Sequence, residues 1–407
     1  REEAARILLG QGAWLGALVE GAAASSLAVI DAALKGGGLT LMRTHGAVIA
    51  ARLTGIRALD LRRWPVIAMA LALIFNARRE HRLRAVELMG IALLGARTAP
   101  AGSAERALLR VIESVARRLL GVGDGGARAA HAAGSILDEL PEDEQRAIEG
   151  LLGDLHTHAA VSLLYDGQDE EALARFERAL AISSRPETQL IAFGGIAAIH
   201  ALSGDLDAGR EWVDSALRRS WPAAILNEYQ GSLLRIAQAK IFVEQDRLDE
   251  AEESLSSVWH IIDTIEHWPL LAHLQGTIDI CRDRPAEGLE QLQALRRRRG
   301  ARLTRRQARM LDLTESSLAV AAGDFAAARR LGTHSGDSPM VAIGSARVDL
   351  LDGHHERALR ILGAIDTRAP EPRAHVAVLE AVTLNRLQRP ADAAIAARRA
   401  RTIATAS

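Results

Sequence analysis

A small residue recurs at intervals of 30 to 42 residues through the last two thirds of the chain, each time shortly after a turn-like motif such as LLYDGQDEEALARFERAL at 163–180. These marker positions are Ala172, Gly209, Ala251, Gly288, Ala328, Ala358 and Ala393. The residue twelve positions earlier is small each time: Ala160, Ala197, Ala239, Gly276, Ser316, Ala346 and Ala381. Two antiparallel helices approach closely only where neither carries a bulky side chain. The double spacing therefore predicts a repeated helix pair.

The interval is close to the ~34-residue period of tetratricopeptide repeats. Hydrophobic residues make up 48% of the chain and aromatic residues only 3%, so the core must consist mainly of Ala, Leu, Ile and Val. Ala and Leu favour helices, whereas strands are enriched in aromatic and β-branched residues. The third joint has Gln-Asp in place of Gly-Asp, and Pro285 and Pro390 suit a first helical turn. We predict an all-α, tetratricopeptide-like superhelix, an α-solenoid.

The pattern weakens toward the N-terminus. Residues 64–96 fit a helix pair with its turn near Arg79–His81, and residues 104–140 fit another around Gly123–Gly126. Two earlier helical stretches are followed by a break at KGGG, residues 35–38. We predict an N-terminal helical region at 1–62, degenerate helical pairs at 63–150 and the repeat array at 151–407, with eight to eleven pairs in total.

Charge and cysteine content exclude several classes of protein. Fifty basic and 51 acidic residues give a net charge of −1, which argues against direct nucleic-acid contact by this segment. A single cysteine, Cys281, rules out an intramolecular disulfide framework and fits a reducing compartment. No apolar run reaches the length of a membrane span. We therefore expect a cytoplasmic protein without membrane contact. Because the chain begins at Arg1 without a Met, we also expect it to be a segment of a longer protein.

The sequence carries no constellation that predicts catalysis. The only lysines, Lys35 and Lys240, lie outside any phosphate-binding Gly-Lys-Ser/Thr context. The stretch VWHIIDTIEHW (258–268) places two histidines, an aspartate and a threonine at helical i, i+3, i+4, i+7 spacing. We interpret it as a solvated helix face, with a metal site as the weaker alternative. Cys281 has no recognisable motif around it. We predict no enzyme activity, no cofactor and no metal.

An arginine-rich run, LRRRRGARLTRRQAR (295–309), holds eight arginines. It either docks an acidic or nucleic-acid surface or is solvated by the helix that follows, and the second interpretation is favoured because aromatics are absent. LTRRQARMLDL (303–313) superficially resembles the entry to a DNA-reading helix-turn-helix, but the residues after it fit the repeat instead.

Ligand-facing positions follow from the repeat register. In a tetratricopeptide-like superhelix the first helix of each pair lines the concave face, and we count back 11 and 15 residues from each marker. A helix predicted over about 223–245 is longer than its neighbours and adds an extra turn. Trp212, Trp221, Trp259 and Trp268 either provide ligand contacts or fill the core. The candidate ligand-binding residues are Asn227, Tyr229, Gln230, Lys240, Glu244, His273, Thr277 and Arg347.

Three segments together resemble the central region of large LuxR-family (MalT-like) transcriptional regulators: REEAARILLGQGAWL, WPVIAMALALIFNARREHRLRAVELMGIALL and GQDEEALARFERALAI. In that family an ATPase domain precedes a tetratricopeptide-like sensor and a DNA-binding domain follows it. The resemblance implies a sensor arm that binds a small-molecule inducer or a regulatory protein. Binding would then bias the protein's own ATPase and DNA-binding domains between two states.

A second hypothesis is a stand-alone tetratricopeptide scaffold that binds peptides of partner proteins without a role in transcription. An α-helical enzyme is a third possibility, without any supporting constellation. Self-association of the array is compatible with both of the first two hypotheses.

Overall fold

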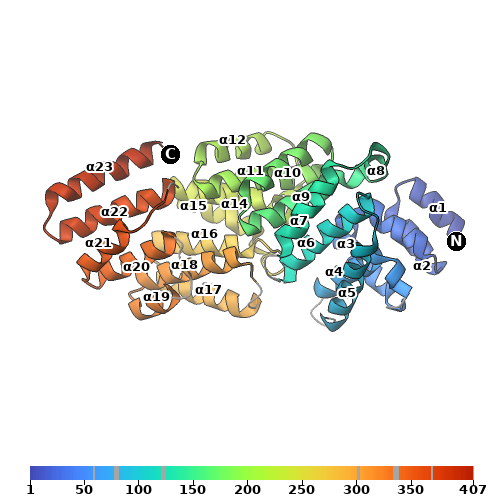
Figure 1. The fold of residues 1–407 in the computed structure, drawn as a ribbon, viewed down its shortest axis with the longest axis horizontal. Coiled ribbons are helices and arrows are strands. Elements are labelled where there is room, and N and C mark those ends of the chain that lie inside the picture. The colour runs from blue at the N-terminus through green and yellow to red at the C-terminus, as the bar shows by residue number, and fades with distance from the viewer. Residues whose placement is uncertain are drawn as a thin grey trace. The chain divides into compact units, whose positions relative to one another are not determined.

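The computed structural model describes residues 1–57, 60–77, 82–120, 125–299, 303–332, 339–367 and 370–406. Within these ranges every regular element is a helix, and the chain divides into two compact units, Arg1–Ala192 and Phe193–Ser407 (Figure 1). None of the described helices is long and apolar enough to cross a membrane.

Unit 1 begins with three helices and continues as helix pairs. Its helices are α1 (Glu2–Gly10), α2 (Trp14–Ala23), α3 (Leu27–Leu53), the 3-10 helix η1 (Asp60–Arg63), α4 (Pro65–Ala77), α5 (Arg82–Thr98), α6 (Ala104–Leu120), α7 (Gly125–Asp138), α8 (Glu142–Ala147), α9 (Glu149–Asp166) and α10 (Asp169–Ile182). The strongest packing joins α4 to α5, α6 to α7 and α9 to α10. The predicted pairs at 64–96 and 104–140 are thus α4/α5 and α6/α7.

The predicted break at KGGG is a kink inside α3, where Gly38 has φ 60° and ψ −157°. A side chain at Gly38 would lie 2.8 Å from Leu151 Cδ2, so glycine also permits the contact with α9. The turn predicted near Arg79–His81 lies outside the described residues, as does Gly123 of the next turn, while Gly125 and Gly126 begin α7.

Unit 2 is a stack of helix pairs. It contains most of α11 (Pro186–Ser203), then α12 (Leu206–Leu217), α13 (Ala223–Leu226), α14 (Tyr229–Glu244), α15 (Leu248–Trp259), α16 (Trp268–Cys281), α17 (Pro285–Arg299), α18 (Arg305–Ala321), α19 (Phe325–Gly332), α20 (Pro339–Leu351), α21 (His355–Gly363), α22 (Pro370–Arg386) and α23 (Pro390–Ala406). From α14 onward each first helix packs on its own second helix and on the next first helix (Figure 1). This arrangement is a tetratricopeptide-like α-solenoid, as predicted.

The paired small residues lie where the two helices of each pair meet. All fourteen are buried except Ala381, which is half-buried and packs against the cluster that contains Ala393. A methyl group added at Gly209 would lie 3.1 Å from the backbone nitrogen of Ala201. One added at Gly288 would lie 2.9 Å from both Asp279 Cβ and Leu318 Cδ2. The physical reason for the repeat pattern is therefore confirmed: these positions permit close helix approach.

The joints share a second feature, a left-handed residue five positions before each marker. These residues are Gly167, Gly204, Asp246, Asp283, Gly323, Gly353 and Gln388, with φ between 58° and 91°. At every joint the next backbone N–H donates to the carbonyl five residues back, as from Arg247 to Phe242 O at 2.8 Å. This is the Schellman helix ending, which satisfies carbonyls that the helix leaves unpaired. The Gln-Asp joint is thus built like the Gly-Asp joints.

Candidate functional site

The long helix predicted over about 223–245 is interrupted. α13 ends at Leu226, Glu228 is extended with φ −106° and ψ −168°, and α14 begins at Tyr229. With 16 residues, α14 is no longer than α18, which has 17, so the prediction of an extra turn is wrong. The break brings the carbonyl oxygen of Leu226 against Gly231, where an added Cβ would lie 1.9 Å from it. Gly231 is the sequence signal that marks this break.

The three candidate residues at this break have different surroundings. Asn227 is exposed, and its Oδ1 accepts hydrogen bonds from Arg235 Nη2 at 2.7 Å and Nε at 3.2 Å. Tyr229 is buried, donates its hydroxyl to Glu266 Oε1 at 2.7 Å and stacks on His267. Gln230 is half-buried. Tyr229 thus anchors α14 to the segment before α16 and leaves little surface for a ligand.

Four other candidate residues come together on α14 and α16. Lys240 is 7% exposed, and its ammonium lies 2.5 Å from the carboxylate of Glu244, one turn further along α14. His273 on α16 is close enough to feel the charges of both. Thr277 follows one turn later and donates its hydroxyl to the carbonyl of His273 at 3.0 Å. The register therefore identified neighbouring side chains on consecutive first helices.

His273 is held as a neutral imidazole. Burial, reinforced by the charge of Lys240, lowers its pKa to about 4, while Glu244 opposes the shift. Its Nδ1 lies 2.8 Å from Thr314 Oγ1 on α18, and that hydroxyl already donates to Met310 O at 2.8 Å. Nδ1 must therefore carry the proton, which leaves Nε2 as an acceptor. Thr314 was not a predicted site residue; its signal would have been its place in the next repeat, one residue beyond the register position 15 before the marker.

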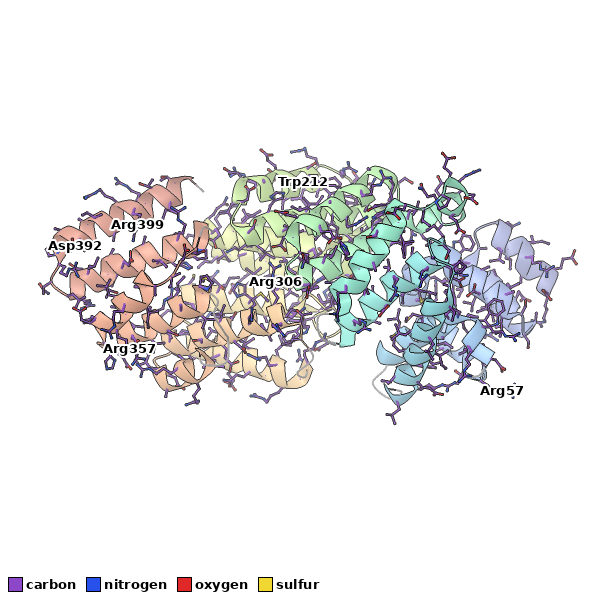
Figure 2. The ribbon with its side chains drawn as sticks, viewed as in Figure 1. Arg57, Trp212, Arg306, Arg357, Asp392 and Arg399 are labelled. Carbon is purple, nitrogen blue, oxygen red and sulfur yellow. The ribbon has the colours of Figure 1, made fainter. Side chains whose placement is uncertain are left out.

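Arg347 on α20 stands apart from this cluster. It is half-buried and makes no hydrogen bond or ion pair with the residues that the structure describes. Burial lowers its pKa, and no neighbouring carboxylate opposes that shift. Asp349, two residues further along, is engaged by both Arg329 and Arg357. Figure 2 labels Arg357 on α21. Arg347 is thus a partly desolvated cation without a counterion.

The register positions counted 11 and 15 residues before each marker lie close to the seams between successive first helices. A Cβ at Gly194 on α11 would lie 2.6 Å from the backbone nitrogen of Leu234 on α14, and His273 on α16 contacts α18. In the last pair the same positions are Val378 and Val382, which are 50% and 42% exposed. Their assignment to a concave ligand-binding face stays a prediction.

The four tryptophans do not form one cluster. Trp212 and Trp221 are half-buried and lie 5.6 and 6.1 Å from the buried ring of Phe193, between α11 and α12. Trp212 is labelled in Figure 2. Trp268 is buried at the start of α16, beneath the guanidinium of Arg299. These contacts favour the interpretation that the tryptophans fill the core.

The interpretation of 258–268 as one helical face is wrong. α15 ends at Trp259 and α16 begins at Trp268, with turns between them. His260 is exposed beside Glu228, whereas His267 is buried against Tyr229. Across the described ranges, no three His, Cys, Asp or Glu side chains are arranged to hold a metal ion. Burial raises the pKa of Cys281, helped by the charges of Asp246 and Glu244, so this exposed thiol is a poor nucleophile.

Part of the arginine-rich run binds its own protein. Arg296 pairs with Asp312 at 2.8 Å and Glu315 at 2.7 Å, and Arg298 pairs with Asp263 at 2.9 Å. Arg299 donates to backbone carbonyls of the turn between α15 and α16. The segment 303–313 does not form a helix-turn-helix. It contains the capping box of Thr304 and Gln307 and the first half of the single helix α18, where Figure 2 labels Arg306.

No protein-family model matches the chain, and no curated protein matches it. Among solved structures, the chain is similar to one in the crystal structure of the APC/C hetero-tetramer Cut9–Hcn1, with a TM-score of 0.48 and 12% sequence identity. The similarity covers 99% of this chain and 86% of that chain. These comparisons assign no family, so a functional proposal must rest on the residues described above.

Proposed function

We propose that unit 2 is a protein-interaction array that binds a segment of a partner protein along its first helices. One observation carries the proposal: Arg347 is a half-buried cation with no counterion among the described residues. Desolvating a charge without a partner is costly, and a bound carboxylate would offset that cost. The partner group that fits Arg347 is therefore an aspartate, a glutamate or a chain-terminal carboxylate.

The cluster on α14 and α16 would add polar specificity to such an interaction. Lys240 supplies an ammonium donor, Glu244 a carboxylate acceptor and His273 a neutral ring nitrogen, all on adjacent first helices. Together they match a partner segment with mixed donors and acceptors and do not require a highly charged one.

Site-specific photo-cross-linking tests where a partner binds. A photoreactive residue replaces Thr277 on α16 or, as the matched control, the exposed Glu253 on the second helix α15. We expect one dominant cross-linked partner from position 277 and none from 253. Equal cross-linking at both positions, or none at 277, would contradict the proposal.

The contribution of Arg347 is tested with the purified partner. Arg347→Gln should weaken binding about tenfold or more, the usual cost of losing a charge-assisted hydrogen bond. The free energy of unfolding should not fall, because the arginine has no partner to lose. Unchanged affinity in a folded Arg347→Gln variant would remove this residue from the site.

We propose further that the array is the sensor arm of a LuxR-family, MalT-like regulator. Support comes from the three sequence segments that resemble that family and from the repeat that both share. Sequencing the coding region on both sides is the direct test. An ATPase domain upstream and a LuxR-type DNA-binding domain downstream are expected; a start codon just before Arg1 and a stop codon just after Ser407 would instead support a stand-alone scaffold.

A further inference from the structure

A cavity of about 180 Å³ lies in unit 1, where the last turns of α3 meet α4 and α5. Its deep walls are Leu53 of α3, Leu71 and Phe75 of α4, and Leu88 of α5, all 7% exposed or less. Ile56, just after α3, lies at its half-buried side. The interior surface is therefore almost wholly aliphatic and aromatic.

The size of the cavity restricts what could occupy it. Protein interiors are close-packed and contain few voids larger than a water molecule. An apolar cavity of about 150 Å³ stays dry and binds benzene, whereas drug-sized ligands need about 300 Å³ or more. This cavity is suited to one small ring or a branched aliphatic group.

The polar side chains at the cavity already have partners. Arg84 donates from Nη1 to Glu87 Oε2 at 2.6 Å and from Nη2 to the carbonyl of Ile56 at 3.4 Å. Thr54 donates its hydroxyl to the carbonyl of Ala50. Because the guanidinium is neutralised by Glu87, the cavity offers no free charge to a ligand carboxylate. An uncharged ligand is therefore favoured over a fatty acid or another anion.

We propose that this cavity binds a small, uncharged, apolar molecule, such as a monocyclic aromatic or a branched aliphatic compound. All residues that line the cavity belong to unit 1, whereas Arg347 and the cluster on α14 and α16 belong to unit 2. The inference is thus independent of the proposed partner binding.

The test uses fluorobenzene as a probe in ¹⁹F NMR, with benzene in parallel thermal unfolding. Ala50→Phe places a ring in the cavity from α3, and Ile56→Trp closes it from its half-buried side. Val86→Ala is the control, because Val86 lies on α5 but is 59% exposed and does not line the cavity. The wild type and Val86→Ala should show saturable binding, and benzene at ten times its Kd should raise Tm by about 3–5 °C.

Both filling variants should weaken fluorobenzene binding at least tenfold while circular dichroism shows native helix content. If Ala50→Phe does not fold, Ile56→Trp decides the outcome, because its site is not deeply buried. The proposal is overturned if the wild type shows no saturable binding up to the solubility of fluorobenzene. It is also overturned if a folded filling variant binds the probe as the wild type does.

Discussion

Replacing Gln388 with glycine should stabilise the last helix pair. Gln388 occupies the left-handed position between α22 and α23 with φ 60°, and its side chain is exposed. That conformation costs an L-residue about 1–2 kcal/mol. Glycine avoids this cost but loses about 0.5–1 kcal/mol more conformational entropy on folding. The difference predicts a gain of about 0.5–1 kcal/mol for Gln388→Gly.

Native-state hydrogen exchange is the appropriate assay, because repeat arrays unfold in parts and lack a single free energy of unfolding. The slowest-exchanging amides of α22 and α23 should exchange about 2–5 times more slowly in Gln388→Gly. Gln388→Ala keeps the left-handed cost and should leave the rates nearly unchanged.

The reverse experiment uses Gly353, which holds the same position between α20 and α21 with φ 81°. No atom lies within 4 Å of a Cβ added there, so Gly353→Ala tests the backbone without a steric clash. It should destabilise α20 and α21 by about 1 kcal/mol. Faster exchange in Gln388→Gly, or no effect of Gly353→Ala, would refute the assignment of these positions as equivalent helix endings.

Three further predictions concern pH, packing and capping. His156 is 2% exposed and burial lowers its pKa to about 4, so its stabilising effect is complete above the unfolded pKa of about 6.5 and is lost as the pH falls toward 4; at pH 5 the loss is about 2 kcal/mol, which His156→Gln should abolish in pH-dependent urea titrations. Ala172→Leu should cost about 1–3 kcal/mol by overpacking the α9/α10 contact, whereas the same change at exposed Ala174 should be nearly neutral in the same titration. Thr304→Ala should cost about 1 kcal/mol and speed amide exchange in the first turn of α18, and Thr304→Ser should not.

The helix pairs were predictable because each joint depends on local chemistry. A small residue at Ala251 and another at Ala239 permit close packing, and the turn between them needs only one left-handed residue. Asp246 takes that conformation almost as readily as glycine, because its short polar side chain tolerates it. Local requirements of this kind recur at fixed spacing and can be read from one sequence.

The interruptions were less predictable because their causes are not local. Residues 260–267 carry helical spacing, yet two carbonyls of this turn accept hydrogen bonds from Arg299, more than thirty residues away. The break before Tyr229 brings Leu226 against Gly231, and only the glycine marks it in the sequence. A period of 3.6 residues therefore identifies a helical tendency and does not reveal a tertiary contact that ends the helix.

The same limit applies to the candidate site. His273 and Thr277 of α16 occupy the register positions of Val378 and Val382 of α22, but the first two are half-buried while the valines are largely exposed. The next first helix, α18, reaches His273 through Thr314, and among the described residues no first helix follows α22. Register therefore determines which side of a first helix a residue faces, whereas the neighbouring pair determines whether that residue is accessible. Arg347 stands out because it combines this register with a charge that its neighbours do not neutralise, a property that no single repeat encodes.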